Sequence, residues 1–215
     1  MRESGILMHI TSLPAPYGIG TMGKDAYAFV DFLVRAGQRY WQILPLTPTG
    51  YGDSPYQSLG ACAGNHYLID LDRLADEGLL KKEEIQNIPW GSNPARVDFG
   101  AMYAHRMNVL RQAFQRFTPD GAYETFVEQN RSWLEDYALF TALKDTLGGK
   151  PWLDWPEALR LRKADALAEK RRELSDEIRL QYFVQYEFDR QWKALRSYAN
   201  AKGVRIIGDV PIYVP

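Results

Sequence analysis

The chain has 215 residues, and 26 lysines and arginines balance 27 aspartates and glutamates to give a net charge of −1 at pH 7. This balance excludes the strongly basic surface that nucleic-acid binding requires, so we expect no nucleic-acid partner. Hydrophobic residues make up 46% and charged residues 25%, as in an ordinary folded domain. No apolar run approaches the ~20 residues of a membrane span, so we expect no membrane insertion.

The single cysteine, Cys62, cannot form an internal disulfide, which fits a reducing compartment. The N-terminus lacks the long apolar region and small-residue cleavage site of a signal peptide. We therefore predict a cytoplasmic protein. Cys62 stands between two alanines and is predicted to be a small buried apolar residue, not a nucleophile.

The chain begins with a predicted strand-helix-strand unit. Gly5–Ile10 is short and apolar and is predicted as a strand. Asp25–Gly37 has apolar residues at helical spacing, an acidic start and a glycine stop, and Tyr40–Leu46 is a second apolar run. A unit of this length predicts parallel strands joined by a right-handed crossover.

About 150 residues then precede the third predicted strand, too many for one connection, so they form an insertion with its own packing. The pattern is almost continuously helical from Pro156 to Ala201, with charge-rich irregularity predicted over Lys163–Glu173, and the run Glu169–Glu173 is interpreted as a solvated helix face. The third strand is predicted at Val204–Tyr213. The earlier helices of the insertion are predicted at Leu71–Glu77, Lys81–Gln86, Phe99–Phe117 and Ala122–Leu147.

The predicted fold class is α/β. Three parallel strands with helical crossovers fit either an open doubly wound sheet or the opening third of a (β/α)8 barrel. Periodicity alone does not separate these two architectures.

The segment Tyr51–Ser58 follows the second strand and combines two tyrosines, a carboxylate, a carboxamide and two hydroxyls. Flat rings beside short hydrogen-bonding groups suit a sugar, whose C–H faces stack on aromatic rings while its hydroxyls need donors and acceptors. The same residue types also make ordinary surface turns, so residue type alone leaves both interpretations open.

This segment and its surroundings resemble the amylomaltases, the 4-alpha-glucanotransferases of glycoside hydrolase family 77, which include the plant disproportionating enzymes. Four blocks match in order along the whole chain, which is far more specific than any one block. They are Gly5-Ile-Leu-Met-His-Ile-Thr-Ser-Leu-Pro14 with Tyr17-Gly-Ile-Gly20, Tyr40-Trp-Gln-Ile-Leu-Pro-Leu46 running into Tyr51–Ser58, Gly64-Asn-His-Tyr-Leu-Ile-Asp-Leu71, and Gly208-Asp-Val-Pro-Ile-Tyr-Val214.

The resemblance implies the N-terminal part of a (β/α)8 TIM barrel, about three parallel strands with a long, mainly helical insertion after the second. On this basis residues 1–50 start the catalytic barrel, 51–200 form the substrate loop and the insertion, and 201–215 hold the third strand. Barrel sites lie at the C-terminal ends of the strands, where the distinctive polar blocks of this chain are found.

The activity implied is transfer of α-1,4-glucan segments between maltodextrins by a retaining double displacement, without a cofactor. In the family, the nucleophile, the acid/base glutamate and a stabilising aspartate come from later strands, so we expect no catalytic group in this chain. The chain stops at Pro215, directly after an apolar segment, which looks like a cut through a domain. We therefore expect an N-terminal portion whose partners are an α-1,4-glucan and the missing C-terminal remainder of its own barrel.

By matching motif, Tyr56 should stack against the sugar next to the scissile bond, with Ser54 and Gln57 close by. Asp209 matches an aspartate that the family shares with the wider alpha-amylase group, near the same sugar. Tyr51 resembles a tyrosine outside the main cleft that binds glucan in some members. Alternatively, Tyr56 anchors its loop, and Asp209 caps a helix or pairs with an arginine.

His9 is a further candidate for substrate binding, although its residue type and place favour a hydrogen-bonding anchor for the loop after the first strand. Asn65 is predicted to fix loop geometry. The histidines His9, His66 and His105 lie far apart without paired ligand spacing, so no metal site is predicted.

A second function class remains open from the sequence: a free-standing glucan-binding or scaffolding module that reuses part of the fold without catalysis. The parent reading frame separates the two hypotheses. Further strand-ending Asp and Glu motifs beyond residue 215 favour the enzyme, and a natural stop codon favours the module.

Overall fold

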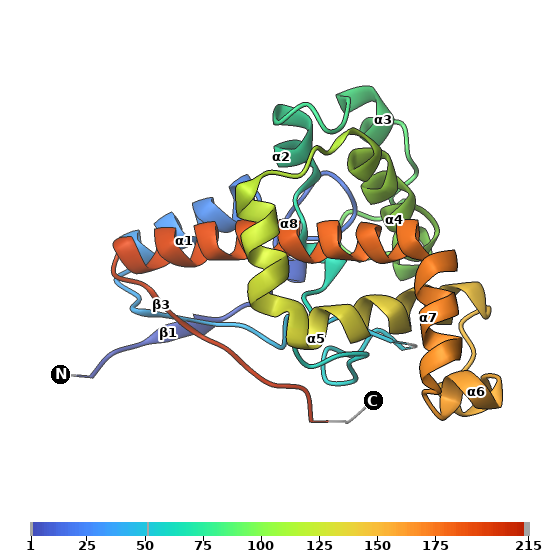
Figure 1. Cartoon of the computed structure of the whole chain (residues 1–215). Helices are drawn as coiled ribbons and strands as arrows, with labels where there is room; N and C mark the ends of the chain where they lie inside the picture. The colour runs from blue at the N-terminus through green and yellow to red at the C-terminus, as the bar shows by residue number, and fades with distance from the viewer. Residues whose placement is uncertain (1, 51, 213–215) are drawn as a thin grey trace. The chain divides into compact units, whose positions relative to one another are not determined.

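A computed structural model, drawn in Figure 1, describes residues 2–50 and 52–212. It contains three short strands in one sheet. The strands β1 (Gly5–Leu7), β2 (Tyr40–Gln42) and β3 (Arg205–Ile207) lie in the order β1-β2-β3. Both pairs are parallel, with Tyr40 opposite Gly5 on one side and opposite Arg205 on the other. The predicted parallel sheet is therefore confirmed, with β2 at its centre.

Eight α-helices and three short 3-10 helices account for the rest of the described regular structure. The predicted helical segments after β1 and β2 are confirmed within one or two residues at their ends. In chain order the helices are η1 (Ile10–Ser12), α1 (Lys24–Arg35), η2 (His66–Leu68), α2 (Leu71–Asp76), α3 (Lys82–Gln86), α4 (Phe99–Arg116), α5 (Gly121–Thr146), η3 (Trp152–Asp154), α6 (Glu157–Arg160), α7 (Ala164–Glu173) and α8 (Ser175–Ala201).

The strands are shorter than predicted, for reasons visible in the backbone. After β1 the chain turns into η1, where Ser12 N donates to His9 O at 3.0 Å. After β2 comes Pro45, which has no N–H for a sheet ladder. Pairing does continue one residue past the strand ends, because Ile43 N donates to Ile207 O at 3.0 Å.

Two other predictions were wrong. The charge-rich stretch predicted as irregular is the helix α7, which begins with Asp165 in its first turn and ends with Lys170, Arg171 and Arg172 in its last. These charges complement the helix dipole, and Leu167 supplies a buried contact. Cys62 is exposed, because the chain bends at residues 61–62 in the loop after β2.

The chain forms two compact units, residues 1–117 with 187–215, and residues 118–186. Each unit has its own apolar core. In the second unit, Leu139 and Leu143 of α5 pack with Trp155, Leu159 and residues of α7 and of the start of α8. These two units do not correspond to the predicted division into residues 1–50, 51–200 and 201–215, which is based on the order of barrel strands. That division remains a prediction.

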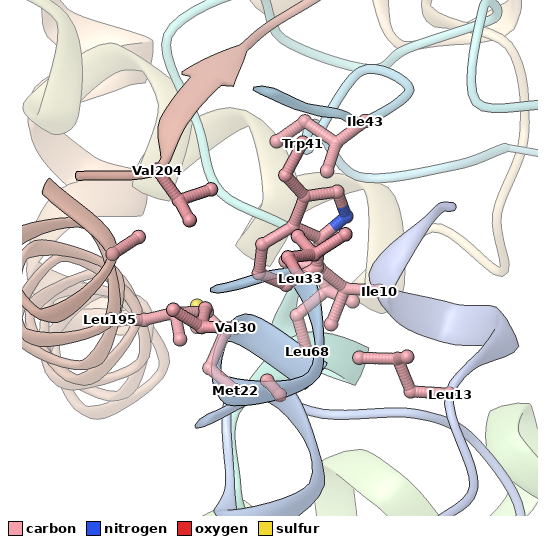
Figure 2. Packing of buried hydrophobic residues seen from close by; sticks show 12 residues of the cluster. Ile10, Leu13, Met22, Val30, Leu33, Trp41, Ile43, Leu68, Leu195 and Val204 are labelled. Atoms are coloured by element: carbon pink, nitrogen blue, oxygen red, sulfur yellow. The ribbon is translucent and has the colours of Figure 1, made fainter. Parts of the chain in front are cut away.

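The core of the first unit lies between the sheet and two helices. Trp41 and Ile43 from the central strand region pack with Val30 and Leu33 of α1 and with Leu195 of α8, all nearly or fully buried. Figure 2 shows these side chains pointing toward one another around the Trp41 indole. Trp41 Nε1 donates to Met8 O at 2.7 Å, so the central residue of the core also holds the exit of β1.

Close packing at Gly64 leaves no room for a side chain. A Cβ added there would meet the Phe188 ring at 2.1 Å. We predict that Gly64→Ala lowers the free energy of unfolding by about 1–3 kcal/mol, measured by urea denaturation, because the ring or the backbone must shift. Gly208→Ala is the control, since a Cβ there meets nothing within 4 Å. Equal effects of the two substitutions would contradict this packing.

Candidate functional site

The candidate site lies where the three strands end. Met8 N donates to Gln42 O and Ile43 N donates to Ile207 O, each at 3.0 Å, so the chain leaves all three strands at one edge of the sheet. His9 follows β1, the loop of residues 47–60 follows β2, and Asp209 follows β3. The sequence prediction that the polar blocks gather at the C-terminal edge of the sheet is therefore confirmed.

Backbone hydrogen bonds give the loop of residues 47–60 a defined shape. Thr49 and Ser58 form an antiparallel bridge, and Gly50 N donates to Gln57 O at 3.4 Å. At the tip, Gly52 has φ 90° and Asp53 has φ 55°, in the left-handed region that residues other than glycine rarely adopt. Non-glycine residues in this region occur at functional loops, where the surrounding structure holds them in place.

One hydrogen bond at this edge joins two residues that lie 153 positions apart in the chain. The Tyr56 hydroxyl donates to Asp209 Oδ2 at 2.8 Å. This hydrogen bond to the Asp209 carboxylate, with its neighbouring negative charge, raises the pKa of Tyr56 above the ordinary tyrosine value. The phenol is therefore a hydrogen-bond donor throughout the neutral range.

Asp209 is exposed and uses both carboxylate oxygens. Oδ2 accepts from Tyr56, and Oδ1 accepts from the backbone N–H of Val210 at 2.8 Å. These contacts hold the carboxylate beside the phenol at the end of β3. Tyr56 is half-buried, and its ring belongs to a loop that Asp209 helps to anchor.

Ser54 and Gln57 flank Tyr56 in the same loop. Ser54 Oγ accepts from Tyr56 N at 3.3 Å, and Ser54 O accepts from Gln57 N at 3.1 Å. Gln57 is exposed. Ser54 thus fixes the backbone that carries Tyr56, while Tyr51 lies outside the described residues.

His9 makes the anchoring contact that its position indicated. Its Nδ1 accepts from Leu44 N at 3.3 Å, joining the end of β1 to the chain after β2. Burial lowers the pKa of His9 to about 4, so the imidazole is neutral at pH 7, as an acceptor nitrogen requires. A contact of His9 with a substrate remains a prediction.

A buried polar network surrounds η2, and of its members the sequence predicted only Asn65. Asn65 Oδ1 accepts from Tyr67 N at 2.9 Å and Asn65 N donates to Leu46 O at 2.7 Å, which confirms the predicted role of Asn65 in loop geometry. Arg106 of α4 is fully buried and donates to the carbonyls of Tyr67 and Ile69. Its sequence signal was an arginine on the apolar face of a helix, four residues after Met102 and three before Val109.

A second part of this network surrounds Asp70. Its carboxylate accepts from Thr21 Oγ1 at 2.6 Å and caps α2 by accepting from Arg73 N at 3.0 Å. Asp70 N donates to Gln191 Oε1 at 2.7 Å. The start of α2 is thereby tied to the loop before α1 and to α8 within the first unit.

Over residues 2–50 and 52–212, no three His, Cys, Asp or Glu side chains are grouped so that they could hold a metal ion. None of the helices in this same part is both long and apolar enough to cross a membrane.

Comparison with known proteins gives consistent matches. The sequence model of a family described as 4-alpha-glucanotransferase matches residues 8–215. A 4-alpha-glucanotransferase from Thermus thermophilus is 50% identical over 219 residues, covering 99% of this chain and 43% of that protein. One from Clostridium butyricum is 47% identical over 209 residues, covering 96% of this chain and 43% of that protein.

A solved structure is similar over the whole chain. It is an amylomaltase from Streptococcus agalactiae in complex with acarbose, 47% identical, with a TM-score of 0.95. The match covers 100% of this chain and 44% of that one. The chain therefore spans less than half the length of the relatives that it matches.

The Tyr56–Asp209 contact predicts how the phenol titrates. Its folded-state pKa lies above the unfolded value of about 10, so the stability it contributes is complete below that value and is lost as pH rises through the folded pKa. We predict that Asp209→Asn returns the pKa of Tyr56 toward the ordinary value. The measurement is a ¹³Cζ-tyrosine NMR titration, with the signal assigned by Tyr56→Phe.

Tyr40 provides the matched control for this titration. Its hydroxyl donates to Glu3 Oε2 at 2.7 Å, and this bond raises its pKa in the same way. The Tyr40 titration should be the same in the wild-type protein and in Asp209→Asn. A Tyr56 titration that is also the same in both proteins would show that the two side chains do not interact.

Proposed function

Because the chain belongs to the 4-alpha-glucanotransferase family, glycoside hydrolase family 77, we propose that it supplies part of the substrate cleft of an enzyme that transfers α-1,4-glucan segments between maltodextrins. The observation that carries this proposal is the contact between Tyr56 and Asp209, at 2.8 Å. It joins an aromatic face and a carboxylate at the edge of the sheet where barrel enzymes bind their substrates.

We further propose that the three strands belong to a (β/α)8 barrel. Their parallel pairing and helical crossovers fit the start of such a barrel. Exposed apolar side chains support this proposal, because Leu7 of β1 is 56% exposed and Ile207 of β3 is 44% exposed, and Val210, three residues after β3, is 71% exposed. Neighbouring barrel strands would cover these side chains and close both sheet edges.

The proposed reaction is a retaining double displacement. A carboxylate attacks the anomeric carbon of the donor glucan and forms a glycosyl ester, while an acid protonates the departing glycosidic oxygen. The 4-hydroxyl of an acceptor glucan then attacks the same carbon, passes its proton to the conjugate base of that acid and releases the carboxylate. This chemistry needs two carboxyl groups about 5–5.5 Å apart, and we assign both to the portion of the relatives' length that this chain does not span.

The side chains of this chain would bind the sugar next to the scissile bond. The ring of Tyr56 would stack on that sugar, oriented by the hydrogen bond of its hydroxyl to Asp209. The Asp209 carboxylate would favour the positive charge that develops on the sugar ring in the transition state. Ser54 and Gln57, on either side of Tyr56 in the sequence, would lie close to the same sugar. Tyr51 would bind a longer glucan outside the main cleft.

The relatives support a proposal for the class of substrate. The solved amylomaltase from Streptococcus agalactiae is a complex with acarbose. An oligosaccharide needs aromatic faces and short polar groups, and this edge provides both in Tyr56, Ser54 and Asp209. We therefore assign maltooligosaccharides as donor and acceptor.

Substitutions in the full-length protein that carries this sequence test the site. We predict that Tyr56→Ala lowers kcat/KM for maltotriose disproportionation about ten- to hundredfold, as for loss of one aromatic stacking partner. Tyr51→Ala should have a smaller effect on kcat/KM and act mainly on long glucans. Asp209→Asn should cost at least as much as Tyr56→Ala, because the amide carries no charge. A correctly folded Tyr56→Ala variant with near-normal kcat/KM would refute the assignment.

The proposed location of the catalytic carboxylates outside this chain gives a separate prediction. The 215-residue chain alone should not disproportionate maltotriose, because the proposed nucleophile and acid/base lie elsewhere in the enzyme. The assay is release of glucose and longer maltodextrins by the purified chain, compared with a mock preparation. Release above the mock level would show that the catalytic carboxylates are within these residues.

A further inference from the structure

Arg106 is a buried cation in an apolar setting. It lies on α4 between the buried residues Met102 and Val109, with 0% of its surface exposed. Its guanidinium carbon lies 5.9 Å from the centroid of the Trp90 ring. Burial lowers the pKa of Arg106 to about 10, so the side chain is still charged at neutral pH.

Stability alone does not account for an arginine at this position. The Nε and Nη1 groups of Arg106 are buried without a hydrogen-bond partner among the described residues. A buried charge with incomplete hydrogen bonding is costly, and an apolar side chain of similar volume often serves stability as well or better. We therefore look for the role of Arg106 in the groups to which it donates hydrogen bonds.

Those groups are two carbonyls of one short segment. Arg106 Nη2 donates to Tyr67 O at 2.9 Å and also to Ile69 O. Tyr67 lies within η2 and Ile69 directly follows it. A single guanidinium nitrogen thus bridges both carbonyls and fixes the end of η2 against α4.

This segment connects to the loop that carries Tyr56. Asn65, the residue before η2, caps it and donates its own N–H to Leu46 O at 2.7 Å, where the chain leaves β2 for the loop. Leu46 directly precedes the loop of residues 47–60 that carries Tyr56.

The charge of the Asp70 carboxylate acts on Arg106, whereas the ionisable rings near Arg106 are neutral. Burial and the charge of Arg106 lower the pKa of His66 to about 3, and burial raises the pKa of Tyr67 to about 12, so both rings are neutral. The Asp70 carboxylate is already engaged by Thr21 and by Arg73 N. The two carbonyls are therefore the groups that orient the guanidinium.

We propose that Arg106 is a positioning residue for the glucan site: by holding the Tyr67 and Ile69 carbonyls, it supports η2 and, through Asn65, the loop that carries Tyr56. The link to glucan rests on the proposed function, whereas the link to the loop does not. Arg106 contacts no substrate in this proposal.

The test uses Arg106→Met and Arg106→Lys in the full-length protein that carries this sequence. Amide hydrogen exchange is measured at Asp53, Tyr56 and Gln57 of the loop. In Arg106→Met, exchange there should accelerate about tenfold or more, as expected for loss of hydrogen bonds from a charged donor. Arg106→Lys should restore part of the protection, because an ammonium reaches a carbonyl but lacks the planar fork.

Arg116→Met is the matched control. Arg116 lies on the same helix, also donates to a backbone carbonyl, Leu79 O at 3.1 Å, and pairs with Glu84. Its removal should change the melting temperature and leave exchange at the loop amides unchanged. A loss of stability alone therefore cannot mimic the expected result.

Maltotriose kinetics give the second readout. A displaced Tyr56 should lower kcat about tenfold in Arg106→Met and change KM less, because correct placement matters most in the transition state. If the unaltered protein shows no transfer, the proposed function fails, and the exchange data still decide the role of Arg106.

Three outcomes overturn the proposal. Loop exchange in Arg106→Met could equal that in Arg116→Met. Loop exchange could accelerate while kcat and KM remain those of the active, unaltered enzyme. Both Arg106 variants could fail to fold, which would make Arg106 a requirement of the fold and not of the site.

Discussion

The parallel pairing of β1, β2 and β3 is the constraint on which the site depends. Parallel strands leave a sheet in the same direction, so chain segments far apart in sequence meet at one edge. This is why Tyr56 reaches Asp209 across 153 residues with a bond of 2.8 Å. The buried Trp41 at the centre of β2 fixes the arrangement, because it fills the core and also holds Met8 through its indole N–H.

The loop after β2 is held from two sides. At the sheet edge, Tyr56 is anchored to Asp209 and its backbone to Ser54. Where the loop begins, Asn65 N donates to Leu46 O, and Arg106 donates to the carbonyls of the η2 segment that Asn65 precedes. Such a double support suits a binding site, since a stacking ring contributes most when its position is fixed before the ligand arrives.

Much of this structure could be predicted from local patterns. Helical spacing and a glycine stop predicted α1, which buries Ala26, Val30 and Leu33 on one face. The bounds of α4 and α5 were also predicted within one residue. The gathering of Tyr56 and Asp209 at one edge followed from the parallel topology together with the family resemblance. Neither residue type alone distinguished a sugar site from a surface turn.

What could not be predicted depended on tertiary contacts. The turn at η1 ends β1 early, and Pro45 limits β2. The helix α7 is stabilised by Leu167, which packs in the core of the second unit, and this contact is not visible in a charge-rich sequence. Cys62 is exposed where the chain bends at residues 61–62, which its apolar neighbours in sequence did not indicate. The partners of Arg106 are backbone carbonyls 37 and 39 residues away, which leave no trace in side-chain spacing.

The most direct measurement of the central claim is a crystal structure of the full-length protein that carries this sequence, with a bound maltooligosaccharide. The account predicts that one sugar ring stacks on Tyr56 within about 4 Å and that a sugar hydroxyl lies within hydrogen-bond distance of Asp209, about 3 Å. A glucan bound in the cleft with Tyr56 and Asp209 both out of its reach would contradict it.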